Sequence, residues 1–169
     1  MPSTGDRHVF VRLYQQYVRP HLEFASLAWS PWREGDKECL EKVQKRALGM
    51  MAGLISRDYM ERLKELGLTT LEERRHQLDK VHVYKTVKGV GGVNNEQWFK
   101  MADNVRVTRG MDPLNIWIQV ARLETRRNFF SHRVPEAWNI VPRGIRQART
   151  AQVFKKAYKD HKRQMVAIS

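Results

Sequence analysis

The sequence has a single cysteine, Cys39, which excludes a disulfide bond within the chain and a zinc knuckle. Its six histidines show neither the H-x3-H nor the HExxH spacing of zinc sites, and we expect them at the surface or at the edge of the core. These absences predict a protein with no metal ion and no cofactor.

Long apolar runs are also absent. The longest, Ala47–Ile55, is far shorter than the roughly 20 residues that span a bilayer. The first ten residues, MPSTGDRHVF, lack the apolar core of a signal peptide. We therefore expect an intracellular protein, in the nucleus, the cytoplasm or both, with no membrane among its partners.

Acidic residues are scarce relative to basic ones: 18 Asp and Glu stand against 31 Lys and Arg, a net charge of +13. The excess is concentrated in residues 105–169, where 14 bases and 4 acids give +10, whereas residues 1–104 carry 17 bases and 14 acids. This charge favours a polyanionic partner, RNA or DNA or both. The alternative is a solvated cationic surface without a partner.

Hydrophobic residues make up 41% of the chain and include five tryptophans, which predicts a folded core. Their spacing is mostly helical, so we expect a mainly α protein. The sequence divides into a helical bundle (1–88), a linker with a short helix at Trp98-Phe99 (89–104), and a small basic helical subdomain (105–169). The glycine-rich break KGVGGVNN (88–95) lacks the GKS and GxGxxG patterns of phosphate loops.

Proline and capping residues mark the expected helices of the first part. A helix over Val9–Arg19 should stop before Pro20, and a second, over residues 21–29, should stop before Ser30-Pro31. The third helix is expected to begin at a cap, Asp36, and to end near Gly53. Its apolar face and its ion pairs are expected at these residues: Leu40, Val43, Ala47 and Met50, and Glu38–Lys42 and Glu41–Lys45.

Two further helices have clear start and stop signals. Asp58 should cap YMERLKEL, which Gly67 ends in a left-handed conformation. Thr70 and Glu73 form a capping box that opens a helix to about Val87. Its buried stripe is expected at Leu71, Leu78, Val81 and Tyr84.

The basic C-terminal part has room for two short β segments, Val105–Gly110 and Ile116–Val120, followed by helices. We expect a helix over Thr125–Arg133, a new turn from Pro135, and a loop at Pro142 and Gly144. Thr150 should cap the last helix, AQVFKKAYKDHKRQ. Its expected apolar stripe is Phe154, Ala157, Tyr158 and His161, with the basic residues on the opposite arc.

Three phrases of the sequence resemble one family. They are LYQQYVRPHLEFASLAWSPW (13–32), LEKVQKRALGMMAGL (40–54) with YMERLKELGLTTLEERRHQLDKVHVYKTVKG (59–89), and RLETRRNFFSHRVPEAWNIVPRGIRQARTAQVFKKAY (122–158). In this order they resemble the region after the palm of Jockey-like non-LTR retrotransposon (LINE-type) reverse transcriptases. The similarity runs nearly from end to end.

The resemblance implies a thumb-like bundle and the connection beyond it, which hold template and primer near a palm located elsewhere. The paired-aspartate motif of that family's palm is absent, and its endonuclease is missing as well. Two catalytic metal ions need closely grouped acids, and the acids here are expected as helix caps and ion-pair partners. We therefore expect a nucleic-acid-binding chain that is not an enzyme.

Arginines of the last third are the first candidates for phosphate contacts, because the guanidinium fork suits phosphate oxygens. These arginines are Arg122, Arg126, Arg127, Arg133, Arg143, Arg146 and Arg149. The last helix adds Lys155, Lys156, Lys159, Lys162 and Arg163. A second candidate set is Lys42, Lys45 and Arg46, which could equally serve only to balance Glu38 and Glu41.

Two alternatives remain open at this point. The tryptophans have apolar neighbours, so we expect them in the core, although stacking on unpaired bases is the other interpretation. The chain could also be a retroelement-derived interaction or structural fragment. In that case the apolar helices over Val9–Trp29 bind a reverse transcriptase palm or another protein.

Overall fold

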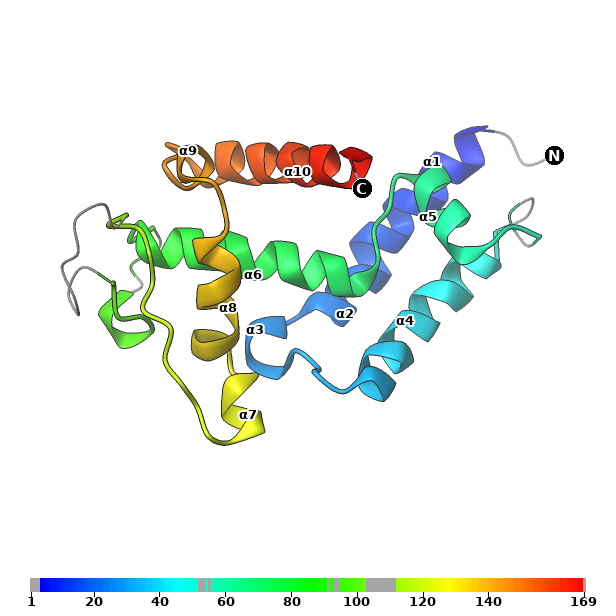
Figure 1. The fold of residues 1–169 in the computed structure, drawn as a ribbon. Coiled ribbons are helices and arrows are strands. Elements are labelled where there is room, and N and C mark those ends of the chain that lie inside the picture. Colours follow the sequence, from blue (N-terminus) through cyan, green and yellow to red (C-terminus); the bar gives the residue numbers. More distant parts are fainter. Residues whose placement is uncertain are drawn as a thin grey trace. The chain divides into compact units, whose positions relative to one another are not determined.

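A computed structural model describes residues 4–51, 54, 56–90, 92, 95–102 and 112–168, and it confirms the mainly α class (Figure 1). The chain forms two compact units, Met1–His76 and Gln77–Ser169. They divide within helix α6 (Leu71–Val87), upstream of the predicted linker at 89–104. The predicted β segment Val105–Gly110 and the predicted helix end at Gly53 lie outside the described residues.

The first helix does not stop before Pro20, and that prediction was wrong. Helix α1 (Thr4–Leu13) continues through a π-helical turn, η1 (Tyr14–Val18), into α2 (Arg19–Glu23). The N–H of Arg19 donates to the carbonyl of Tyr14, five residues earlier. Pro20 then lies in the first turn of α2, where a missing N–H costs little. The wide turn thus carries the helix past the proline.

The predicted helix over residues 21–29 is interrupted. Ala25 takes a left-handed conformation, with φ of 50°, and separates α2 from α3 (Ser26–Trp29). The end of α3 at Trp29 agrees with the stop expected before Ser30-Pro31.

Helix α4 (Glu34–Gly49) begins two residues before the predicted cap, Asp36, which lies in its first turn and does not cap it. The buried residues of α4 are Gln44 and Leu48, whereas Val43 and Met50 are exposed, so the predicted apolar face was wrong at these two positions. The reason is that a polar residue, Gln44, is buried in a hydrogen-bond network.

That network joins four elements of the first unit. The Tyr14 hydroxyl donates to Gln44 Oε1 at 2.5 Å, and Gln44 Nε2 donates to Tyr59 Oη at 2.8 Å. Tyr59 in turn donates to Glu41, whose carboxylate accepts the N–H of Leu71 at 3.1 Å. Burial raises the pKa of the Tyr14 hydroxyl to about 12, so the hydroxyl remains a donor at neutral pH.

The cap predictions for the next two helices are confirmed. Asp58 accepts the N–H of Met60 at 3.1 Å and opens α5 (Tyr59–Leu66), which ends at Gly67 with φ of 64°. Thr70 Oγ1 accepts the N–H of Glu73 at 3.2 Å at the start of α6. One apolar cluster of this unit contains four buried residues: Tyr14, Leu48, Leu63 and Leu68.

The second unit begins with the C-terminal half of α6 and a 3-10 turn, η2 (Asn95–Gln97), which precedes Trp98-Phe99 rather than containing it. The predicted strand Ile116–Val120 was wrong. Within the described residues, β pairing is confined to an isolated antiparallel bridge between Met101 and Ile116. The chain after Ile116 is irregular as far as α7 (Glu124–Arg127).

The helix predicted over Thr125–Arg133 is two helices, because the chain turns at Asn128-Phe129 between α7 and α8 (Phe130–Asn139). Pro135 lies inside α8 instead of starting a new turn. The loop expected at Pro142 contains a short helix, α9 (Arg143–Arg146), for which Pro142 is the N-cap. Thr150 caps α10 (Ala151–Ile168) as predicted, accepting the N–H of Val153 at 3.3 Å.

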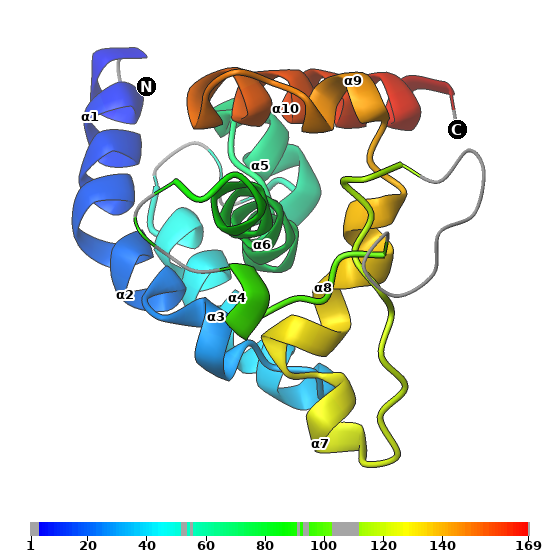
Figure 2. The same cartoon turned by 90° about the vertical axis from the view of Figure 1, so that its left-hand side faces the viewer.

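Stacked aromatic rings form the core of the second unit. Phe154 of α10 stacks on Tyr84 of α6 with ring centroids 4.7 Å apart, and lies 5.8 Å from the ring of Trp138 in α8. Figure 2 looks nearly along α6, with α8 and α10 beside it. The predicted apolar stripe of α10 is confirmed, since Phe154 and Tyr158 are buried and Ala157 and His161 half-buried.

Candidate nucleic-acid interface

The two units differ strongly in charge. Residues 1–76 carry 13 bases and 11 acids, a net of +2, whereas residues 77–169 carry 18 bases and 7 acids, a net of +11. The cations of the second unit fall into two groups, exposed side chains and side chains used inside the fold. Only the first group is available to an external phosphate.

Helix α10 has an exposed cationic face. Lys156, Lys159 and Arg163 lie opposite Phe154 and Tyr158, as the 100° step of an α-helix requires, and all three are exposed. Arg163 lies 3.8 Å from Asp160, a surface pair that contributes little stability. Lys155, also exposed, flanks this face.

The prediction was wrong for Lys162, which is half-buried on the inner flank of α10 instead of lying on the opposite arc. It is electrostatically coupled to Lys80 of α6, whose Nζ lies 5.8 Å from the centre of the Tyr158 ring. Burial lowers the pKa of the Lys80 ammonium, and the charge of Lys162 lowers it further, although Asp79 opposes them. Lys162 is therefore less suited to a phosphate contact than its neighbours on α10.

Two of the predicted phosphate-binding arginines are used inside the fold. Arg146 is 5% exposed, and its guanidinium donates to Asp112 at 3.0 Å and to Asn115 at 2.7 Å. Arg133 donates to Asp79 through two nitrogens, at 2.9 and 3.2 Å. Neither pairing was predicted, because the acids lie 34 and 54 residues away in sequence.

The remaining arginines of the predicted set are exposed. Arg126 and Arg127 lie on α7, with Arg122 just before it; the Nε of Arg127 donates to the carbonyl of Ala121 at 2.9 Å. Arg149 lies between α9 and α10. Arg143 of α9 is 62% exposed at its side chain and lies 3.8 Å from Asp112. These five arginines and the outer face of α10 form the candidate interface of the second unit.

The second candidate set lies on α4 of the first unit, among acids. Lys42 and Glu38 form the expected pair at 3.7 Å. The expected Glu41–Lys45 pair was wrong: the Glu41 carboxylate accepts from Tyr59 and from the N–H of Leu71, and Lys45 lies 5.2 Å from the centre of the Tyr59 ring. Arg46 is exposed.

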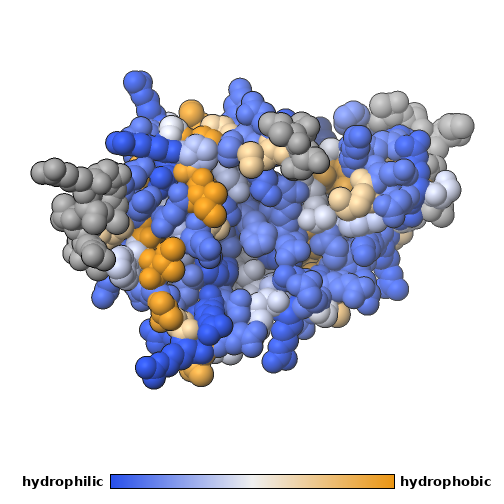
Figure 3. Space-filling model, viewed as in Figure 1, coloured by the Kyte–Doolittle hydropathy of each residue, from blue (hydrophilic) through white to orange (hydrophobic). Residues whose placement is uncertain are grey.

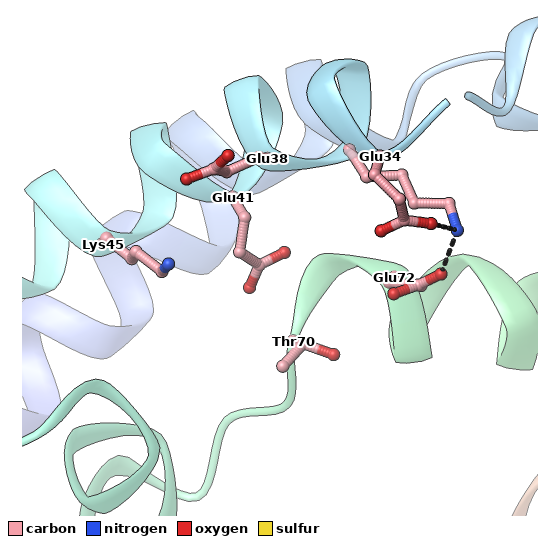
Figure 4. A pocket seen from close by; sticks show the side chains of 7 residues that line it. Glu34, Glu38, Glu41, Lys45, Thr70 and Glu72 are labelled. Atoms are coloured by element: carbon pink, nitrogen blue, oxygen red, sulfur yellow. Dashed lines mark hydrogen bonds and ion pairs between the residues drawn. The ribbon is translucent and has the colours of Figure 1, made fainter. Parts of the chain in front are cut away.

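A shallow cavity of about 190 Å³ lies beside this set, between α4 and the start of α6 (Figure 4). Its charged lining comprises four glutamates and two lysines: Glu34, Glu38, Glu41 and Glu72, with Lys37 and Lys45. Lys37 bridges Glu34 and Glu72 at 2.7 and 2.8 Å, and its hydrogen bond lowers the pKa of the Glu72 carboxyl. The excess of carboxylates disfavours a phosphate here.

The tryptophans do not all lie in the core, and that prediction was wrong for four of them. Trp138 is fully buried, but Trp29, Trp32, Trp98 and Trp117 are between 37% and 40% exposed. Their apolar sequence neighbours gave a misleading signal, because several of those neighbours, including Ile118 and Val120, are exposed too.

Within the part of the chain that the structure describes, no three His, Cys, Asp or Glu side chains are grouped so that they can hold a metal ion. None of the described helices is long and apolar enough to cross a membrane. No family model, curated protein or solved structure matches the chain.

Proposed function

We propose that the second unit binds RNA or DNA through phosphate contacts, without base specificity. The observation that carries the proposal is the net charge of +11 on residues 77–169, with most of the predicted cations on α7, α9 and α10 exposed. Asp79 and Asp112, two of the seven acids, are engaged with Arg133 and Arg146. The outer cations therefore keep a positive field that attracts a polyanion.

The resemblance to the post-palm region of LINE-type reverse transcriptases supports the same proposal. In that setting the chain holds template and primer and has no polymerase activity of its own. We expect purified protein to give no primer extension and no nuclease cleavage with magnesium or manganese. Activity that survives stringent repurification would contradict this part of the proposal.

Fluorescence anisotropy over a salt series tests the binding. If about five phosphates are neutralised, log K should fall with log salt at a slope of roughly −3.5 to −4.5. The affinity should depend little on base sequence. Absence of binding at low salt, or binding that does not change with salt, would rule the proposal out.

A second candidate function rests on the first unit. Val9, Leu13 and Tyr17 follow one another at intervals of four on one helical path, and their exposed fractions are 57%, 50% and 68%. Such an apolar face is typical of a protein-interaction site. We propose as an alternative that this face binds a reverse transcriptase palm or another protein. A triple change of these residues to serine should then abolish that association and leave nucleic-acid binding unchanged.

A further inference from the structure

Exposed aromatic rings lie in the basic unit. Trp98 is 40% exposed, Trp117 is 37% exposed and Phe129 is 47% exposed. Each is close in sequence to exposed cations, namely Lys100, Arg122, Arg126 and Arg127. Whether rings and cations form one surface depends on how the segments 98–102 and 115–130 are joined.

Backbone pairing places Trp117 beside Lys100. The N–H of Trp117 donates to the carbonyl of Lys100 at 2.7 Å, and the N–H of Ala102 donates to the carbonyl of Asn115 at 2.9 Å. Side chains alternate between the two faces of such a ribbon. Ile116 is buried, whereas Trp117 and Lys100, which lie opposite each other across the pairing, are both exposed.

The other two rings are joined to α7. Trp98 packs edge-on against Phe130, with ring centroids 6.0 Å apart, and Phe129 directly precedes Phe130. The N–H of Phe129 donates to the carbonyl of Arg126 at 3.2 Å, which holds Phe129 against the end of α7. Figure 3 shows hydrophobic side chains interspersed with hydrophilic ones over the segment that leads into α7. These contacts bring the exposed rings and cations of residues 98–100, 117–122 and 126–129 into the same part of the second unit, here called the aromatic–cationic surface.

We propose that the aromatic–cationic surface, Trp98, Lys100, Trp117, Arg122, Arg126 and Phe129, binds the unpaired bases of single-stranded RNA or DNA. Aromatic side chains stack on any base whose ring face is open, and neighbouring cations neutralise the phosphates between bases. In a duplex these ring faces are covered by the adjacent base pairs. The inference rests on the proposed function and adds to it a preference for single strands.

The test compares a labelled single strand of about 16 nucleotides with its duplex, for both RNA and DNA. The variant carries Trp98→Leu and Trp117→Leu. We expect it to lose about tenfold or more in single-strand affinity and to keep its duplex affinity within about twofold. Trp117→Phe, which keeps a ring, should retain most of the single-strand affinity that Trp117→Leu loses.

Trp32→Leu is the matched control, because Trp32 is 38% exposed but lies in the nearly neutral first unit. It should change neither affinity. Because Trp98 contacts Phe130, its replacement can destabilise the fold, so the melting temperature of each variant is measured. If the double variant melts at a lower temperature than wild type, the comparison of Trp117→Leu with Trp117→Phe decides the result.

The outcomes separate the inference from the proposed function. If wild-type protein binds neither single strand nor duplex, the proposed function fails. If wild-type protein binds both forms with a steep salt dependence and the leucine variants bind like wild type, nucleic-acid binding stands and the inference is overturned. An equal loss of both affinities also overturns it, since stacking acts on open bases alone. If instead the leucine variants bind like wild type, the exposed rings, with Ile118 and Val120 exposed beside them, are better suited to a protein partner.

Discussion

Arg133 and Asp79 face each other in a two-point ion pair, with Nη2 2.9 Å from Oδ1 and Nε 3.2 Å from Oδ2. Their side chains are 16% and 6% exposed. A third nitrogen of Arg133 donates to the carbonyl of Asn128 at 3.0 Å. Arg133 thus fastens α8 to α6 within the second unit, and its charge is committed to the fold.

Removing one partner of this pair should destabilise the second unit. Asp79→Ala leaves the Arg133 guanidinium little exposed and without its carboxylate, and we expect a loss of about 3–5 kcal/mol in the free energy of unfolding. Urea unfolding followed by circular dichroism measures it. The control is Arg126→Ala, an exposed cation, which should cost less than about 0.5 kcal/mol. If Asp79→Ala and Arg126→Ala lowered the free energy of unfolding equally, the Arg133–Asp79 pair would contribute no more to stability than an exposed cation does.

Gly67 and Gly35 offer a matched pair for backbone conformation. Gly67 has φ of 64°, and a Cβ added at either glycine meets nothing within 4 Å. Gly67→Ala should therefore destabilise the protein by about 1 kcal/mol through backbone strain alone. Gly35 lies in the first turn of α4, so Gly35→Ala should stabilise the protein slightly, by about 0.5 kcal/mol. Thermal melting measures both effects: the melting temperature should fall for Gly67→Ala and rise slightly for Gly35→Ala. Shifts of the same sign would contradict the left-handed conformation assigned to Gly67.

The parts of the fold that could be predicted are those with local causes. Asp58, Gly67, Thr70 and Thr150 act on backbone groups a few residues away, so their roles can be read from the sequence. The helix end predicted before Pro20 was wrong, because the residue before a proline only tends to avoid the helical conformation. A single π turn was enough to carry the helix past it.

Long-range partners explain most of what was missed in the candidate site. No local sequence pattern indicates that Asp79 pairs with Arg133 or that Asp112 pairs with Arg146, since these ion pairs form only when the chain has folded. The buried Gln44 is a similar case, because its partners Tyr14 and Tyr59 lie on other helices. The excess of positive charge, in contrast, follows from the composition of the sequence alone and could be predicted without the fold.

His82 should make the stability of the second unit depend on pH. Burial, and secondarily the charge of Lys85, lower the pKa of this half-buried imidazole below its ordinary value of 6.5. The unfolded chain then binds a proton that the folded chain does not. The contribution is complete above pH 6.5 and is lost as the pH falls toward the lower folded-state pKa. Urea midpoints should therefore decrease between about pH 7.5 and 5.5.

The control for this effect is His82→Gln, which cannot titrate. Its urea midpoint should change less than that of wild type over the same pH interval. A decrease as large in the variant as in wild type would assign the pH dependence to other groups.

The last prediction concerns which cations carry the phosphate contacts. Lys156, Lys159 and Arg163 form the outer face of α10, whereas Lys162 is half-buried near Lys80. Changing these three outer residues to glutamate should lower nucleic-acid affinity at least about tenfold. It should also reduce the slope of log K against log salt by roughly 0.9 for each phosphate that the variant no longer neutralises. Thermal stability should change by less than about 0.5 kcal/mol, because the changes avoid caps and core.

The matched variant reverses Lys42, Lys45 and Arg46 on α4. We expect it to weaken binding only partly, because the carboxylates around the adjacent cavity already disfavour phosphate. It should also cost some stability, since it places like charges at Glu38 and Lys42 and removes Lys45 from the Tyr59 ring. Fluorescence anisotropy and thermal melting of both variants show which helix, α10 or α4, contributes more to nucleic-acid binding. If the α4 variant lost all binding while the α10 variant bound normally, α4 would be the element that contacts the phosphates. The charge of α10 would then belong to a solvated surface, because a phosphate-contacting helix cannot tolerate three reversals without loss of affinity.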